Sequence, residues 1–322
     1  MLHLATSVLL ACIRRSGRAG VIVNEHTLTA VQTRRHVEVL GRWFDFIHLD
    51  DLPRRLAQPG QRPFCLLTFD DGKRSNATEA APELVRLGVP AVFYVTTGFL
   101  TSRTPLWFDR QRLLVRALGY CPAGLELETL KQLPFAALNQ RLDRACVRLG
   151  VILETASEDE RPMSWEDARS LSRRGFSLGA HGLTHAILTR EPREHACAEI
   201  EESLAQVSGE LGAACKTFAF PNGNYNPELA QHALKSGATT VMTTEPMWVG
   251  SRSELWCLPR VQLFGAFDRT RIELKIALAA RRGLLANPDG TGRAYRSMRD
   301  HKPMIRTEGS TASATVSSAR PC

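Results

Sequence analysis

Two adjacent carboxylates end an apolar run near residue 70. The stretch 64–69 reads Phe-Cys-Leu-Leu-Thr-Phe, and Asp70, Asp71 and Gly72 follow it directly. Such a run predicts a short buried strand, and Gly72 allows the backbone to turn away from its end. Neighbouring carboxylates repel each other unless a cation or a proton offsets their charge. The pair therefore suggests a metal ligand beside a general base, although Asp-Asp-Gly is also a common surface turn.

A histidine pair supplies the further ligands that this hypothesis needs. His181 and His185 are four residues apart and follow a predicted strand at 176–180. Two imidazoles and one carboxylate form a metal site that keeps a coordination position open for water. In a chain with nine histidines, such a pair taken alone is more often structural than metal-binding. Because another predicted strand of the same chain ends in Asp70 and Asp71, the metal site is favoured. Asp71 would then be the third ligand and Asp70 the base that activates water.

Strand-like and helix-like segments alternate along the chain, as is typical of parallel strands joined by right-handed crossovers. About eight strands fit a (β/α) barrel, and an irregular one is expected. The predicted strands are 20–23, 44–49, 66–69, 91–95, 176–180, 217–220, 239–243 and 258–264. The predicted helices between and after them are 29–43, 76–87, 164–174, 195–211, 227–236 and 269–282. The carboxylates and the histidines then lie at the same end of the barrel.

One domain over residues 1–286 accounts for this pattern, with a motif-bearing core at about 60–265. Residues 100–162 show amphipathic helical stretches at 111–118 and 136–149 without a convincing strand, which predicts a helical insertion. Ser164 and Asp167 match a capping box, which predicts that a helix starts after the insertion. Residues 287–322 are polar and lack an apolar period, so we expect a disordered tail.

Composition limits the classes of partner. The formal charge is +8, but the basic residues are scattered and are not interleaved with aromatic residues as in a nucleic-acid groove, so no nucleic-acid partner is expected. The eight cysteines form no C-x-x-C pair and favour reduced thiols. We expect no transmembrane segment, since no apolar run is long enough. The apolar run near the N-terminus precedes its basic residues, opposite to a signal peptide, so we expect a cytoplasmic protein.

Three stretches carry a family resemblance. Residues 68–72 (TFDDG), 181–185 (HGLTH) and 218–223 (FAFPNG) resemble three motifs of the polysaccharide deacetylases, carbohydrate esterase family 4 or the NodB homology group. The resemblance runs from about residue 65 to 264 and is closest to a subgroup similar to proteins of surface-polysaccharide biosynthesis. It implies a distorted (β/α) barrel, a divalent metal that is usually zinc, and hydrolysis of N-acetyl groups on amino sugars.

The resemblance also implies roles for five residues. Asp70 matches the catalytic base of the family, and Asp71, His181 and His185 match its metal ligands. Asn222 occupies the position whose backbone N–H helps to hold the oxyanion.

Two positions depart from the family pattern. Ala219 stands where the family has an arginine that orients the base, and residues 258–263 lack the histidine that acts as general acid. Without that arginine the pKa of Asp70 is expected to lie higher than in an arginine-bearing relative, unless Arg260 supplies the charge. A guanidinium cannot donate the missing proton. The candidates for substrate contact are Pro221, Tyr225 and Arg260.

The sequence therefore predicts a metal-dependent hydrolase that removes N-acetyl groups from amino sugars of a surface or extracellular polysaccharide or its precursor. Two alternatives stay open: a glycan-binding homologue with impaired catalysis, and a related C–N hydrolase that acts on a small amide. The missing arginine and histidine motivate the first alternative. The complete set of two aspartates and two histidines argues against it, because a binding protein does not need an open metal site.

Overall fold

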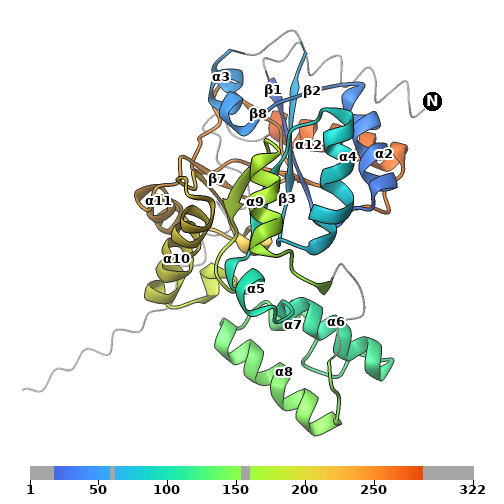
Figure 1. The fold of residues 1–322 in the computed structure, drawn as a ribbon, viewed down its shortest axis with the longest axis vertical. Coiled ribbons are helices and arrows are strands. Elements are labelled where there is room, and N and C mark those ends of the chain that lie inside the picture. The colour runs from blue at the N-terminus through green and yellow to red at the C-terminus, as the bar shows by residue number, and fades with distance from the viewer. Residues whose placement is uncertain (1–17, 59–61, 154–159, 286–322) are drawn as a thin grey trace, which may run out of the picture.

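The fold is a curled, mostly parallel sheet with helices packed around it (Figure 1). The computed structural model describes residues 18–58, 62–153 and 160–285. The tail predicted at 287–322 lies outside these residues. The strands are β1 (Arg18–Glu25), β2 (Asp45–Phe46), β3 (Phe64–Phe69), β4 (Val92–Val95), β5 (Ser177–Ala180), β6 (Thr217–Ala219), β7 (Thr240–Met242), β8 (Val249–Gly250) and β9 (Val261–Gln262).

The sheet order is β7-β6-β5-β4-β3-β1-β8, with β2 paired to β3 and β9 to β1. Neighbours from β1 to β7 pair in parallel, whereas β8 is antiparallel to β1. A parallel bridge between Met242 and Leu258 links β7 to the segment that leads into β9, and β9 pairs with β1. The two edges of the sheet are thus joined through one short segment, which makes the irregular barrel that the sequence predicts.

The residues of β3 contribute alternately to two core clusters, one on each face of the sheet. All six of its residues are buried. Phe64 and Leu66 belong to a core cluster with Ile22, Tyr94 and Met242 on the inner side of the sheet. Cys65, Leu67 and Phe69 belong to the larger core beneath the helices. A strand that is covered on both faces reads as a continuous apolar run, which is the pattern of residues 64–69.

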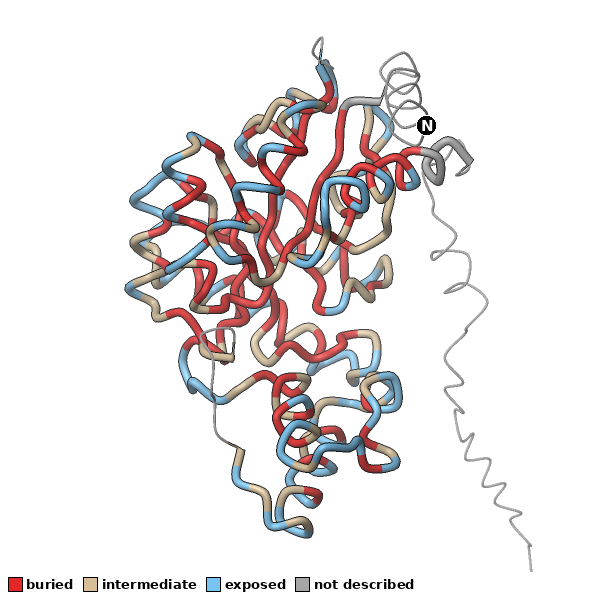
Figure 2. Tube along the Cα trace, turned by 90° about the vertical axis from the view of Figure 1, so that its right-hand side faces the viewer, coloured by how far each residue is buried: buried red, intermediate tan, exposed pale blue. Residues whose placement is uncertain are grey.

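Helices cover the outside of the sheet, and Figure 2 shows burial concentrated in the strands and on the inward sides of these helices. They are α2 (Ala30–Gly41), α4 (Ala81–Leu87), α9 (Trp165–Arg173), α10 (Arg193–Leu211), α11 (Pro227–Lys235) and α12 (Arg269–Leu285). The short helix α3 (Leu52–Ala57) instead contributes Leu52 and Leu56 to the inner core cluster. The capping box predicted before α9 is present, since the side chains of Ser164 and Asp167 each accept from the other's backbone N–H. Within the described residues, no helix is long and apolar enough to cross a membrane.

Four helices lie between β4 and α9: α5 (Thr97–Ser102), α6 (Trp107–Leu118), α7 (Leu127–Leu130) and α8 (Phe135–Leu149). The last three project below the barrel in Figure 1. They share a small core of their own that includes Leu114, Leu130 and Leu142. Ile187, from the loop after β5, packs into this core and joins it to the barrel. We call residues 97–153 the helical insertion.

Two predicted strands are much shorter than expected. Of 44–49, only Asp45 and Phe46 pair as β2, and the segment that follows, for which no helix is predicted, contains α3, whose Pro53 occupies the first turn that proline tolerates. Of 258–264, only Val261 and Gln262 form β9. Pro259 lacks the N–H that a ladder hydrogen bond needs, which limits pairing there.

Candidate active site

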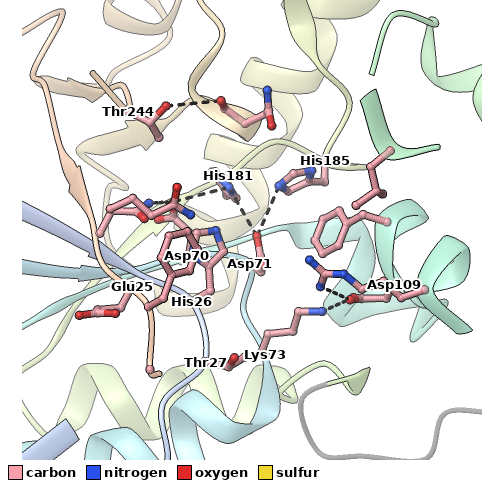
Figure 3. A pocket seen from close by; sticks show the side chains of 18 of the residues that line it. Glu25, His26, Thr27, Asp70, Asp71, Lys73, Asp109, His181, His185 and Thr244 are labelled. Atoms are coloured by element: carbon pink, nitrogen blue, oxygen red, sulfur yellow. Dashed lines mark hydrogen bonds and ion pairs between the residues drawn. The ribbon is translucent and has the colours of Figure 1, made fainter. Parts of the chain in front are cut away.

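The catalytic candidates all follow parallel strands at one end of the barrel. Asp70 and Asp71 follow β3, His181 and His185 follow β5, and Asn222 follows β6. Because the carboxyl ends of parallel strands meet at one edge, residues far apart in the chain lie together there. Figure 3 shows the two aspartates and the two histidines around one pocket, which Asn222 also lines.

Backbone strain gathers at this end of the barrel. Among the described residues, four that are not glycine have a positive φ, and three of them are Asp71 (75°), His185 (61°) and Asn222 (56°). Such conformations are unfavourable for residues with a side chain and persist where the surrounding structure enforces them, often at functional sites. They aim these three residues at the pocket.

Asp71, His181 and His185 form a buried cluster whose ligand atoms lie within 4.8 Å of one another. The Oδ1 atom of Asp71 is 3.7 Å from Nε2 of His181 and 3.4 Å from Nε2 of His185. This oxygen is buried and has no hydrogen-bond partner within the described part of the chain. A buried carboxylate oxygen between two imidazole nitrogens is the arrangement that a divalent cation would complete.

The protonation of the cluster also fits a cation. The Nδ1–H of His181 donates to the carbonyl of Ala219 at 2.7 Å, which leaves the lone pair of Nε2 facing Asp71. Burial lowers the pKa of His181 to about 4, so the imidazole is neutral. Burial alone raises the pKa of Asp71, but the fields of His26, His185 and Lys73 outweigh it and leave this pKa well below its usual range. Neutral imidazoles and an ionised carboxylate are the forms that bind a metal.

Arg260 binds the predicted base from behind. Its Nη1 and Nη2 atoms donate to Oδ1 and Oδ2 of Asp70 at 2.7 and 2.8 Å, and Asn24 donates to Oδ2 as well. Arg260 is completely buried and is further held by the Thr243 carbonyl and by the Thr68 hydroxyl. The guanidinium thus enters from the segment before β9, although position 219 holds an alanine.

This pairing decides which of two expectations from the sequence holds for Asp70, because Arg260 supplies the charge that Ala219 lacks. Asp70 does not lack a guanidinium. Burial raises the pKa of Asp70, but the charges of Arg260 and His181 and the hydrogen bonds from Arg260 outweigh burial and lower it below the usual value. Asp70 is therefore ionised at neutral pH and able to accept a proton.

The pocket in front of these residues has a volume of about 640 Å³. Besides Asp70 and the cluster, it is lined by His26 from the end of β1, by Asn222, and by residues of α6, α7 and the segment after β9. Thr244 donates from its hydroxyl to the carbonyl of Asn222 at 3.4 Å and holds that strained turn. The pocket is large enough for one or two sugar rings, and polar groups gather at one side of it.

The three predicted substrate contacts lie behind the pocket wall. Pro221 is buried. Tyr225 packs beside Phe220, and its hydroxyl contacts Sγ of Cys257 at 2.8 Å. Neither of these residues, nor Arg260, is among the described residues that line the pocket. The sequence predicts that these three residues contact the substrate, whereas in the fold they lie behind the residues that line the pocket.

The insertion contributes a support that sequence reasoning missed. The indole N–H of Trp107 donates to the carbonyl of His185 at 3.1 Å. The ring of Phe108 meets the imidazole of His185 edge to face, with centroids 5.0 Å apart. A buried ion pair between Lys73 and Asp109 ties the same helix to the segment after Asp71. An aromatic pair after a loop reads from sequence as local packing, and only the fold brings it to His185.

The loop between the two histidines is held by Glu199 of α10. Its Oε2 accepts from the backbone N–H groups of Leu183 and Thr184 at 2.7 and 2.9 Å, and its Oε1 accepts from the Thr184 hydroxyl at 2.5 Å. Burial raises the pKa of Glu199, against the effect of these hydrogen bonds. No local pattern around position 199 indicates this role.

Known structures of deacetylases share this fold. A Streptococcus pyogenes deacetylase, PplD, in complex with acetate aligns with a TM-score of 0.56 and 14% identity over 80% of this chain and 97% of that one. IcaB from Ammonifex degensii aligns with a TM-score of 0.54 and 16% identity over 82% and 98% of the two chains. The BpsB deacetylase domain of Bordetella bronchiseptica gives 0.50 and 18% identity over 77% and 97%. At such low sequence identities, these alignments establish a shared fold only.

The sequence comparisons establish the family. No curated protein matches the chain. Residues 57–241 match the family model described as polysaccharide deacetylase. This match spans more than half of the chain and includes the two aspartates, the two histidines and the turn at Asn222. The chain therefore belongs to the polysaccharide deacetylase family.

Proposed function

We propose that the protein is a metal-dependent N-deacetylase that hydrolyses acetamido groups on amino sugars of a surface polysaccharide or its precursor. The observation that carries this proposal is the buried cluster of Asp71, His181 and His185 next to an ionised, arginine-paired Asp70. Asp71 and the Nε2 atoms of both histidines would hold the cation, with zinc the expected ion. When bound, it would polarise the acetamide carbonyl and make water more acidic.

The chain's own residues account for the proton transfers and the charge. Asp70 accepts the proton of the attacking water, and Arg260 holds its carboxylate in one orientation. Asn222 lines the pocket, where its backbone N–H would stabilise the oxyanion that develops from the carbonyl. Pocket walls from the insertion and from the segment after β9 reduce access of bulk water.

His26 is the residue best placed to protonate the leaving amine. The segment 258–263 lacks the histidine that serves as general acid in the family. Among the described residues that line the pocket, His26 is the one histidine outside the metal cluster. It follows β1, the neighbour of β3, and Figure 3 shows it beside Asp70 and Asp71. An imidazole at this position would supply the proton that Arg260 cannot.

The deciding experiment measures metal and acetate together. The purified protein is analysed for bound metal, and acetate release is followed on a panel of N-acetylated oligosaccharides. Asp70→Asn is expected to keep the metal and to lower kcat by about a hundredfold or more, the usual scale of general-base catalysis. Asp50→Asn, which alters an exposed carboxylate that does not line the pocket, is the matched control. A parent protein that binds glycan with metal present and releases no acetate would instead be a binding homologue.

A further inference from the structure

The helical insertion carries an excess of positive charge. Residues 100–153 contain eight Lys and Arg residues against four Asp and Glu residues. Two regions of this segment face cavities: the wall of the catalytic pocket and a second groove on α8. Ion pairs in these regions decide how much of the charge is available to a ligand.

In the catalytic pocket, one carboxylate serves two cations. Asp109 forms the buried pair with Lys73, and its Oδ1 is also 3.5 Å from Nη1 of Arg112. The side chain of Arg112 is 61% exposed, and its guanidinium lies over the ring of Phe108 at 5.4 Å from the centroid. Arg112 therefore shares its carboxylate with Lys73, and its guanidinium lies against the pocket wall.

Two other charged residues of the pocket lining, Lys131 and Glu160, are also ion-paired. Lys131 lines the pocket, and its partner Glu128, at 2.7 Å, is 81% exposed and lies outside the lining. Glu160, an acidic residue of the lining, forms an ion pair with Arg116. On the insertion side of the pocket, Arg112 and Lys131 are thus cations of the lining, and the carboxylate that pairs with Lys131 lies outside the lining.

A second groove of about 620 Å³ is lined by α8 and by the residues just before and after α7. Arg141, Arg144 and Arg148 line it from α8, at spacings that place them on one face of the helix. No Asp or Glu is among the described residues of its lining, and Arg141 donates to the carbonyl of Gly124 at 3.2 Å. The catalytic pocket includes Leu127 and the groove includes Leu125, so the two cavities flank the same short stretch of chain.

We propose that the substrate is an acidic glycan, in which carboxylates recur along the chain beside the N-acetylated sugar. Arg112 and Lys131 would bind a carboxylate next to the reacting unit, and the arginines of α8 would bind one further along. Arginine suits this task because its planar fork matches a carboxylate. Cations in two cavities that share one short stretch of chain fit repeated charges better than a single terminal phosphate. This inference rests on the proposed deacetylase function.

The first test compares two matched substrates, an N-acetylated oligosaccharide that contains uronic acids and its carboxyl-reduced counterpart. The parent is expected to show the higher kcat/KM on the acidic substrate, with a preference that shrinks as salt screens the charges. Arg112→Gln and Lys131→Gln are each expected to reduce the preference by up to about fivefold, the upper range for an exposed ion pair. Replacing all three arginines of α8 by glutamine should reduce it as well. Arg35→Gln, an exposed change on α2 away from the insertion, is the control.

The second test measures binding without turnover. Asp70→Asn, checked for parental melting temperature, is titrated calorimetrically with both oligosaccharides, and the acidic one is expected to bind more tightly. Equal affinities, or affinities that the arginine substitutions leave unchanged, would overturn the proposal. Displacement of the acidic oligosaccharide by pyrophosphate at concentrations similar to those of the free acidic oligosaccharide would also overturn the proposal, in favour of a phosphate or diphosphate group. If the parent releases acetate from neither substrate, the proposed function fails, while the binding data still decide the charge of the ligand.

Discussion

Replacing Arg260 should move the acid limb of the pH–rate profile. In the folded protein both oxygens of Asp70 accept from Arg260, at 2.7 and 2.8 Å, and both side chains are buried. In Arg260→Gln burial still raises the pKa of Asp70, but the charge and the two hydrogen bonds that lower it are gone. A neighbouring guanidinium typically lowers the pKa of an aspartate by about 1–3 units. We expect the acid limb of kcat/KM to move to higher pH by a similar amount.

The same substitution should weaken the fold. Removing one partner of a buried pair typically costs about 3–5 kcal/mol, because the other charge is left uncompensated. The pH dependence of this stabilisation follows from the direction in which the fold moves the pKa of Asp70. The folded-state pKa of Asp70 is lowered, so the pair stabilises the parent above the unfolded-state pKa of about 4 and loses this effect as pH falls through the folded value. Urea unfolding at neutral pH and at about pH 3 should therefore show a larger loss at neutral pH.

The assay is acetate release from an N-acetylated oligosaccharide between about pH 3 and 9, at constant ionic strength, with bound metal measured in each sample. Arg260→Lys keeps a charge without the two-pronged contact, and we expect its acid limb to lie between those of the parent and Arg260→Gln. Arg62→Gln, which removes an arginine from the surface pair with Asp45, is the control. An unchanged acid limb in folded, metal-loaded Arg260→Gln would refute the assignment of Arg260 as the group that sets the charge of Asp70.

Three further changes test other parts of the site. His185→Ala is expected to remove most of the bound metal, since two donors hold a cation poorly, and retention of stoichiometric metal by elemental analysis would contradict the ligand assignment. Trp107→Phe removes the hydrogen bond to the His185 carbonyl and should weaken metal affinity by about tenfold in a chelator competition, whereas Trp165→Phe, which loses a bond to Thr101, should not. His26→Gln should lower kcat on an N-acetylated sugar by about a hundredfold and affect 4-nitrophenyl acetate little, because nitrophenolate leaves without a proton; equal losses on both substrates would argue against a proton donor.

The local sequence predicted the strands that carry the chemistry and the end at which they meet. Residues 64–69 form a continuous apolar run because β3 is covered on both faces, and this pattern requires no knowledge of partners. Asp70 and Asp71 follow that strand, as His181 and His185 follow β5, so the common edge followed from parallel connection alone. The capping box before α9 was likewise readable, since both of its partners lie within four residues.

Tertiary structure decided how each of these groups is held. The position of Arg260 behind Asp70 depends on β9 pairing with β1, and a charge delivered across a barrel leaves no signal near residue 70. The contacts of Trp107 with His185 depend on how the insertion folds back on the loop after β5. Short strands such as β9 form because neighbouring strands pair with them, so their own residues show little of the apolar pattern that predicts a strand. The sequence by itself determined which groups could react, and packing between distant segments decided their charge, support and access.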